Sequence, residues 1–237
     1  MRFPSRARPD APAAVAAPAA EGGNRSRTPW RLAHFCVVDL ELSGLDPKHD
    51  EIISFAAVPI DAGRVVAGNA VYGLCRNTRP LPEESVLVHG IRSVDLADAP
   101  PLDEAIQPLV TLMTDRILVA HTAGIERSFL GPVLRRRGVR LGRPILDTRD
   151  LGALLALERG RPSASSSLGA LAHGLGLPVH RPHHALGDAL TTAQVFIALA
   201  TLLDEREPQT VRTLSLARRR TRTLAVYPAR PDPAIRA

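Results

Sequence analysis

The sequence is poor in cysteine and has no long apolar run. Cys36 and Cys75 are its two cysteines, and they have neither the spacing of a zinc site nor the number needed for a disulfide framework. This usage is typical of a reducing compartment, so we expect a cytoplasmic protein. No apolar run reaches the length needed to cross a membrane, and we therefore expect no membrane partner.

Lysine and aromatic residues are also scarce. Lys48 is the single lysine among 30 basic residues, aromatic content is 3%, and the formal net charge is +6. The positive charge is therefore carried by arginine, whose planar fork can bind two phosphate oxygens at once. This excess indicates nucleic acid or another polyanion as a partner. A GC-rich genome also favours arginine over lysine, so charge alone does not decide the partner.

The 237 residues are enough for one good core with length left for tails, and no internal repeat is present. Residues 1–30 are rich in Ala, Pro, Arg and Gly, and we predict a disordered arm there, with a transit peptide as the open alternative. Residues 31–207 are assigned to one folded domain. Residues 208–237 contain an arginine cluster at 218–222 followed by prolines, which predicts a basic, flexible tail.

The hydrophobic pattern predicts a mixed α/β sheet of five strands flanked by helices. The expected strands cover 33–38 (ended by Ser43-Gly44), 51–60, 65–74, 116–120 and 144–146. The expected helices cover 83–92, 103–113, 125–137, 148–158, 168–174 and 185–206. The order is three strands first and then alternating strand and helix, which is an α/β arrangement.

Two carboxylates stand at the end of the first strand. Asp39 and Glu41 are two residues apart, and because strand side chains alternate, both leave the same face. Paired carboxylates at the end of a buried strand are costly unless positive charge lies between them. Oxygen ligands suit Mg²⁺ or Mn²⁺. The alternative, two solvated acids at a strand end, stays open on spacing alone.

Two further acids lie at element ends, where functional side chains are common. Glu126 is on the first turn of a helix that follows a short apolar strand, and Asp188 is near the start of the longest helix. Taken singly, each is also explained as a first-turn acid favoured by the helix dipole. Asp147 is interpreted as a helix cap.

Histidines supply the candidate general base. His183 precedes Asp188 by five residues, and imidazole, with an ordinary pKa of ~6.5, suits proton removal near neutral pH. His184 is the competing candidate and His180 a third. Zinc binding by these three is disfavoured because no cysteine lies near and the acids offer a harder site. His121 and His89 are expected to pack or to form hydrogen bonds.

Three segments then carry a resemblance to a known family. Val38–Gly44 (VDLELSG), Leu118–Leu130 (LVAHTAGIERSFL) and His183–Ala189 (HHALGDA) follow one another in order. They resemble the three exonuclease motifs of the DEDD superfamily in its histidine-bearing (DEDDh) branch, to which the proofreading epsilon subunit of bacterial DNA polymerase III belongs. The resemblance covers about residues 33–205.

This resemblance implies a ribonuclease H-like fold and a 3′–5′ exonuclease domain over 31–207. It implies that Asp39, Glu41 and Asp188 ligate two divalent ions, Mg²⁺ or Mn²⁺, and that His183 is the general base. Glu126 takes the fourth acidic position, where the family usually has aspartate. Glutamate is one methylene longer but still offers a carboxylate ligand.

The resemblance also implies contacts with the substrate. The positions concerned are Leu42, Ser43, Gly44, His89 and Ile91. Leu42 stands where threonine is common, Ile125 where phenylalanine is usual and Thr122 where asparagine is frequent.

We therefore expect the protein to hydrolyse the terminal phosphodiester bond at a single-stranded 3′ end and to release nucleoside monophosphates. DNA is the expected substrate in preference to RNA. A DNA polymerase subunit is an expected protein partner, and the arginine-rich termini would add salt-sensitive attraction to the backbone. Two alternatives stay open. One is a catalytically weak or inactive nucleic-acid or polymerase-binding module of the same fold, favoured by Glu126 and Leu42. The other is an exoribonuclease acting on short RNA.

Overall fold

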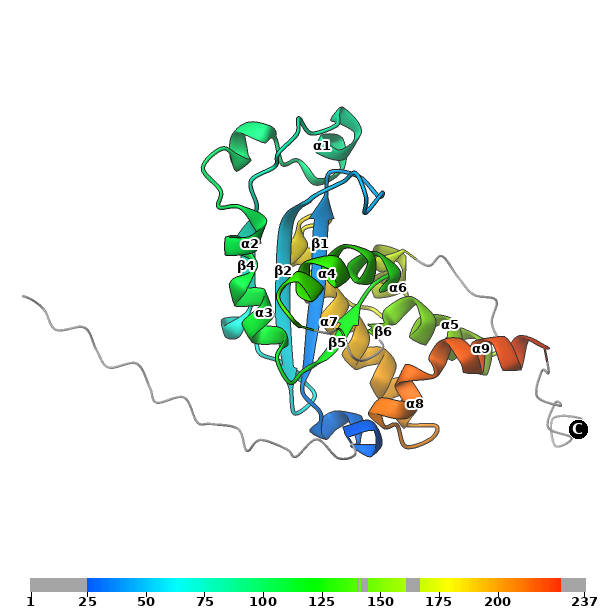
Figure 1. Cartoon of the computed structure of the whole chain (residues 1–237). Coiled ribbons are helices and arrows are strands. Elements are labelled where there is room, and N and C mark those ends of the chain that lie inside the picture. Colours follow the sequence, from blue (N-terminus) through cyan, green and yellow to red (C-terminus); the bar gives the residue numbers. More distant parts are fainter. Residues whose placement is uncertain (1–24, 140, 142–144, 161–166, 227–237) are drawn as a thin grey trace, which may run out of the picture.

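The structure is a computed structural model, and it describes residues 25–139, 141, 145–160 and 167–226 (Figure 1). Most of the arm expected over 1–30 lies outside these residues. Its last part forms two 3-10 turns, η1 (Arg25–Arg27) and η2 (Trp30–Leu32), and Trp30 is buried in the core.

The centre of the molecule is the mixed sheet that the sequence predicts. Its strands are β1 (Phe35–Leu42), β2 (Ile52–Asp61), β3 (Arg64–Val65), β4 (Val71–Leu74), β5 (Ile117–Ala120) and β6 (Leu146–Asp147). The order is β3-β2-β1-β5-β6, with β4 also paired to β2. β2 is antiparallel to β1, β3 and β4, whereas β1, β5 and β6 run parallel.

One strand differs from the prediction. The strand expected over 65–74 is two short strands, β3 and β4, separated by the 3-10 turn η3 (Ala67–Asn69). Gly68 and Asn69 are poor strand residues and favour a turn. The sheet on the described residues therefore has six strands, with β3 and β4 pairing with different parts of β2.

Nine α-helices occupy the described residues. They are α1 (Glu83–His89), α2 (Leu102–Ala105), α3 (Gln107–Met113), α4 (Gly124–Arg136), α5 (Thr148–Glu158), α6 (Leu168–Gly174), α7 (Ala185–Asp204), α8 (Val211–Ser215) and α9 (Ala217–Val226). The single helix expected over 103–113 is divided at Ile106, because Pro108 has no backbone N–H and lies in the first turn of α3.

Helices cover both faces of the sheet, as the alternation along β1 shows. Phe35 and Val37 belong to the apolar cluster that includes α7, whereas Cys36 and Val38 belong to the cluster that includes α3 and α4. β1 is therefore apolar without interruption until Asp39. Both cysteines are free and buried, and burial raises the pKa of each thiol to about 12, so neither is a reactive thiolate near neutral pH.

Helix α7 corrects the expectation that no apolar run is long enough to span a membrane. This helix has 20 residues, and an 18-residue window within it has a mean hydropathy of 1.6, which meets that test by length and composition. In the structure 56% of this window is buried, and the helix packs along β1 and β2. The apolar content of α7 is therefore accounted for by its place in the core.

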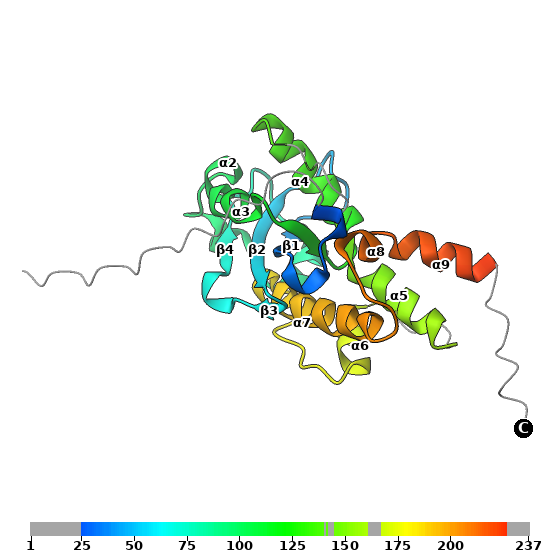
Figure 2. The ribbon, with the colours of Figure 1, turned by 90° about the horizontal axis from the view of Figure 1, so that it is seen from below.

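The tail expected to be flexible from residue 208 is also different where the structure describes it. Helices α8 and α9 occupy most of 211–226, and in both ribbon views α9 lies alongside α5 (Figures 1 and 2). Val211, Leu214 and Ala217 are spaced three apart and join the cluster around α7. The arginines and prolines of this segment obscured that short apolar stripe.

Candidate active site

Three of the predicted acids meet where β1 ends. Asp39 and Glu41 extend the row of Phe35 and Val37, so they leave the sheet on the side that α7 covers. Asp188 is on the first turn of α7. One carboxylate oxygen from each of the three acids lies within 4.8 Å of the others. Two distant segments of the chain therefore bring three carboxylates together.

The fourth predicted acid lines the same cavity but stands apart from this group. Glu126 is on the first turn of α4 and is only 4% exposed. It is not among the three acids whose ligand atoms are closest, and its Oε2 is buried without a hydrogen-bond partner. A buried carboxylate oxygen without a partner is costly unless a cation or a proton compensates it.

The electrostatics of this group show how costly it is. Burial raises the pKa of Asp39 well above its ordinary value, and the charges of Asp188, Glu41 and Glu126 add to the rise. Burial, followed by the charge of Asp188, raises the pKa of Glu41 to about 7. Burial raises the pKa of Glu126 to about 8, and the Asp147 charge adds to the rise. Burial also raises the pKa of Asp188. Burial and mutual repulsion therefore oppose ionisation of these acids unless cations compensate their charge.

His183 faces the acids from the loop before α7. It lines the cavity, and its backbone N–H donates to Oδ2 of Asp188 at 2.9 Å. Its φ of 57° is uncommon for a residue with a side chain, so the fold imposes this backbone turn. Gly187 makes the turn possible, because a Cβ there would overlap the carbonyl oxygen of Arg181.

The two competing histidines are placed differently. His184 is at the N-cap position of α7, and its ring stacks on Tyr72 of β4, with centroids 4.8 Å apart and an interplanar angle of 15°. The backbone N–H of His180 donates to Thr191 at 3.0 Å. On the described residues neither lines the cavity, whereas His183 does.

The cavity has a volume of about 660 Å³. Its walls come from the end of β1 and the loop after it, from α1, from the start of α4 and from the histidine loop. The lining residues are Asp39–Leu45, Asp50, Pro82, Glu84, Ser85, Val88, His89, His121, Thr122, Ile125, Glu126, His183 and Asp188.

Four of the five predicted substrate contacts lie on this wall. Leu42, Ser43, Gly44 and His89 line the cavity, but among the described residues Ile91 does not. The backbone N–H of Ile91 instead donates to Nδ1 of His89 at 3.0 Å. Ile91 therefore reaches the cavity only indirectly, through its hydrogen bond to the lining residue His89.

Asp50 has a structural role that the sequence did not indicate. Oδ1 of Asp50 accepts from the Ser43 hydroxyl at 3.2 Å, and its Oδ2 accepts from the Asp46 backbone N–H at 2.8 Å. A Cβ on Gly44 would overlap the Asp50 carboxylate, so only glycine fits there without movement. Gly44 was the one feature of the sequence that indicated the close approach of the Asp50 carboxylate to the backbone.

The cap predicted at Asp147 is confirmed, and it does more than begin α5. Its carboxylate accepts from the backbone N–H of Arg149 at 2.9 Å. It also accepts from the N–H groups of Thr122 and Ala123 at 3.1 and 3.0 Å, which ties the start of α4 to the start of α5. His121 forms the expected hydrogen bond, Nδ1 to the Thr148 hydroxyl at 2.9 Å.

This donor set fits divalent cations. It consists of carboxylate oxygens, and one buried oxygen of Glu126 has no hydrogen-bond partner. Burial raises the pKa of Asp39 and Glu126, so their negative charges need compensation. Hard cations such as Mg²⁺ and Mn²⁺ prefer oxygen ligands of this kind.

A comparison with known families identifies this arrangement. The profile of the Exonuclease family (RNase_T) matches residues 36–196, a stretch that contains all four acids and His183. The chain belongs to the Exonuclease family. The family match ends inside α7, so α8 and α9 lie beyond it.

Relatives within this family include polymerase-associated proteins. The chain is 37% identical over 188 residues to the "DNA polymerase III subunit epsilon-like protein" of Rhodobacter capsulatus, covering 76% of this chain and 26% of that protein. It is 34% identical over 172 residues to "DNA polymerase III PolC-type" of Thermotoga maritima, covering 72% and 12%. The chain thus spans about a quarter of the length of the first relative and about an eighth of the length of the second.

Solved structures confirm the ribonuclease H-like exonuclease fold. Exonuclease X in complex with 5′ overhanging duplex DNA matches with a TM-score of 0.60 and 23% identity, covering 78% of this chain and 99% of that chain. E. coli Exonuclease I in complex with a dT13 oligonucleotide matches with a TM-score of 0.62 and 19% identity, covering 74% and 42%.

Proposed function

We propose that the protein is a metal-dependent 3′–5′ exonuclease that releases nucleoside monophosphates from a single-stranded 3′ end, with DNA as the preferred substrate. The observation that carries this proposal is the convergence of Asp39, Glu41 and Asp188 within 4.8 Å, with Glu126 and His183 on the same cavity. Membership of the Exonuclease family supports it.

The four acids would hold two divalent ions, Mg²⁺ or Mn²⁺. Asp39, Glu41 and Asp188 are the close group, and Glu126 would supply its unpartnered Oε2. When bound, such ions stabilise negative charge on the attacking and leaving oxygens of a phosphodiester. The protein's own contribution is to gather carboxylates whose mutual repulsion favours cation binding.

His183 would act as the general base. A ring nitrogen would accept a proton from the attacking water, which displaces the 3′ oxygen of the preceding nucleotide in line. The hydrogen bond from the His183 backbone N–H to the Asp188 carboxylate fixes the backbone at His183. The histidine loop and Asp188 therefore keep their relative position. His184, the neighbour of His183, stacks its ring on Tyr72 and is held away from the cavity.

The end of β1 and helix α1 would hold the terminal nucleotide. Leu42, Ser43 and Gly44 line the cavity from the end of β1 and the loop after it, and His89 lines it from the end of α1. Ile91 would act here by fixing His89 through its N–H. Exposed Leu45 and Val88 add apolar surface on this wall, which suits the face of a base.

A DNA polymerase subunit in the cytoplasm is the proposed protein partner. Support comes from relatives whose names place them with DNA polymerase III. Buried, free cysteines agree with a reducing compartment.

The test is a panel of 5′-labelled DNA and RNA single strands of several lengths, incubated with Mg²⁺, with Mn²⁺ or with EDTA. We expect stepwise shortening from the 3′ end with release of monophosphates, faster on DNA, and none in EDTA. Faster cleavage of short RNA would favour the exoribonuclease alternative. Absence of turnover with either metal would leave a binding module, with Glu126 in place of aspartate as the reason.

A further inference from the structure

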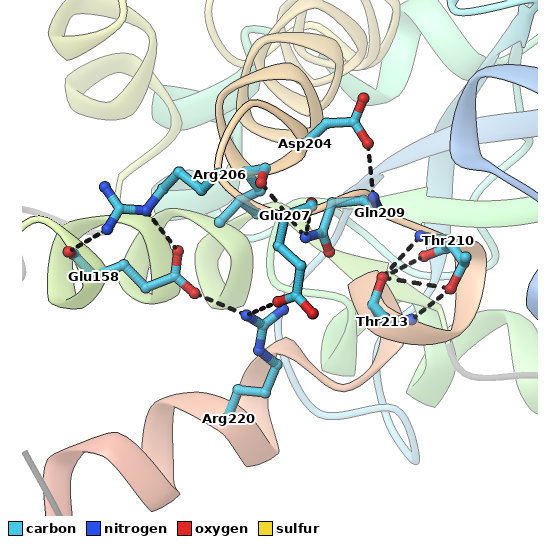
Figure 3. A network of polar contacts seen from close by, with 9 residues as sticks. Glu158, Asp204, Arg206, Glu207, Gln209, Thr210, Thr213 and Arg220 are labelled. Atoms are coloured by element: carbon cyan, nitrogen blue, oxygen red, sulfur yellow. Dashed lines mark hydrogen bonds and ion pairs between the residues drawn. The ribbon is translucent and has the colours of Figure 1, made fainter. Parts of the chain in front are cut away.

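Helix α9 carries four arginines, one of which anchors it. Arg220 donates to Oε1 of Glu158 on α5 at 2.9 Å and lies 3.5 Å from Glu207. Glu158 also pairs with Arg206 at 3.5 Å, so two arginines hold it (Figure 3). The Glu158 and Arg220 side chains are 14% and 28% exposed, so this contact is partly shielded from solvent. The helix is therefore docked on α5.

The other three arginines are exposed. Arg218 and Arg222 are one helical turn apart and so lie on the same side of α9, and Arg219 is their neighbour. Burial and the charge of Asp147 raise the pKa of Asp150 on α5, and the charges of Arg218, Arg149 and Arg222 act against this rise. Helix α9 packs against α5, and these two arginines are on the part of α9 whose charge acts on the first turn of α5.

That first turn of α5 leads directly to the cavity. The Arg149 guanidinium donates to the hydroxyl of Thr122 at 3.4 Å, and Thr122 lines the cavity. Asp147 binds the backbone of Thr122 and of Arg149, which fixes the two segments together. Arg149 on the cavity side of α5 and the exposed arginines of α9 therefore lie on neighbouring elements, α5 and the helix packed against it.

We propose that this series, Arg149 with Arg218, Arg219 and Arg222 of α9, is the path of the upstream part of a single-stranded nucleic acid whose 3′ end is in the cavity. The inference rests on the proposed function, which supplies the substrate. It goes beyond the family, since α9 lies outside the matched residues 36–196.

Charge and dimensions favour a nucleic acid as the occupant. Arg218, Arg149 and Arg222 act on Asp150, and Arg219 is exposed beside them, so four arginines outnumber the two carboxylates of this region, Asp147 and Asp150. The exposed arginines of α9 lie within residues 218–222, about 6 Å along the helix axis, so they can contact neighbouring phosphates of one strand. Arginine suits phosphate because its fork can bind two oxygens. Because the path begins at the cavity, one strand can occupy both.

The test compares two variants with equal loss of charge. R218Q/R219Q/R222Q removes the exposed arginines and keeps the Arg220 anchor, and glutamine preserves helix propensity. The control R64Q/R135Q/R136Q removes three exposed arginines elsewhere. Arg64 is on β3, at the opposite edge of the sheet from β6 and α5, and the other two are at the far end of α4.

Binding is measured with a labelled 20-nucleotide DNA strand in the Asp39→Asn background, so that the strand is not cut, over a series of salt concentrations. We expect the α9 variant to weaken binding roughly tenfold or more at low salt and to reduce the slope of log affinity against log salt by about 2. The control should change both quantities much less. Thermal unfolding of both variants verifies that α9 is still docked.

A dinucleotide separates this inference from the proposed function. With Asp39 restored, the α9 variant should hydrolyse a dinucleotide as fast as the unmodified protein, and kcat/KM should fall only for the long strand. If the α9 variant and the control bind the long strand equally, the path is wrong, and α9 becomes a candidate surface for an acidic protein. If no protein cleaves the dinucleotide while the α9 variant still loses strand binding, the path stands and the proposed activity fails.

Discussion

Replacing Glu126 with glutamine should stabilise the metal-free protein at high pH. In the folded protein the pKa of Glu126 is about 8, against an ordinary value of 4.5. Between these two values the folded state holds a proton that the unfolded state has released. The free energy of unfolding contributed by this group therefore falls as pH rises from 4.5 to 8 and then stays constant.

The size of the effect follows from the same shift. One pKa unit corresponds to about 1.4 kcal/mol, so the raised pKa costs on the order of 4 kcal/mol at pH 8 and about 1 kcal/mol at pH 5. Glutamine removes this cost but leaves a buried amide, whose penalty of about 1–3 kcal/mol does not depend on pH. The gain from Glu126→Gln should thus be about 3 kcal/mol larger at pH 8 than at pH 5.

Urea unfolding in EDTA at pH 5, 6, 7 and 8 measures this difference. Glu84→Gln is the matched control, because Glu84 lines the same cavity but is exposed, and its replacement should change stability little at any of these pH values. With saturating Mn²⁺ at pH 8, Glu126→Gln should lower the free energy of unfolding instead of raising it. The reason is that cation binding stabilises the wild-type protein more than the variant. If Glu126→Gln is equally destabilising at pH 5 and pH 8 in EDTA, the account of the buried acids is wrong.

Three other substitutions test the parts that position the site. His183→Gln should lower kcat by about 10²–10⁴ with Mn²⁺ binding unchanged in calorimetry, and an intact kcat would exclude His183 as the base. Gly187→Ala should lower kcat at least about tenfold, because its Cβ meets the backbone of the histidine loop; unaltered kinetics would show that the loop can move freely. Asp147→Ala should lower the free energy of unfolding by about 2–4 kcal/mol in urea, since three backbone N–H groups lose their acceptor, and a loss below ~1 kcal/mol would refute that role.

The site was predictable where it depends on local geometry. Alternation along β1 placed Asp39 and Glu41 on one face, and helix starts placed Glu126 and Asp188 at element ends. The order of the three motifs then indicated that they meet, and the cavity lining agrees. The choice of His183 over His184 came from the resemblance to the family, whose histidine stands five residues before its last aspartate.

The missed features depend on contacts between distant segments. Tyr72 stacks on His184 from 112 positions away, and nothing near either residue signals it. Asp50 supports the turn at Gly44 through side-chain bonds that its own sequence context does not specify. Helix α9 is held by the ion pair of Arg220 with Glu158 on α5 and by the buried Ala217, and neither contact can be read from the arginine-rich segment alone.

Counting Mn²⁺ by calorimetry at pH 8 tests the central claim most directly. The account predicts two ions bound by the wild-type protein, with protons released as the raised-pKa carboxyls ionise. Asp39→Asn should lose at least one of them. Failure of the wild-type protein to bind Mn²⁺, or equal binding by Asp39→Asn, would contradict the claim that these gathered carboxylates form a metal centre.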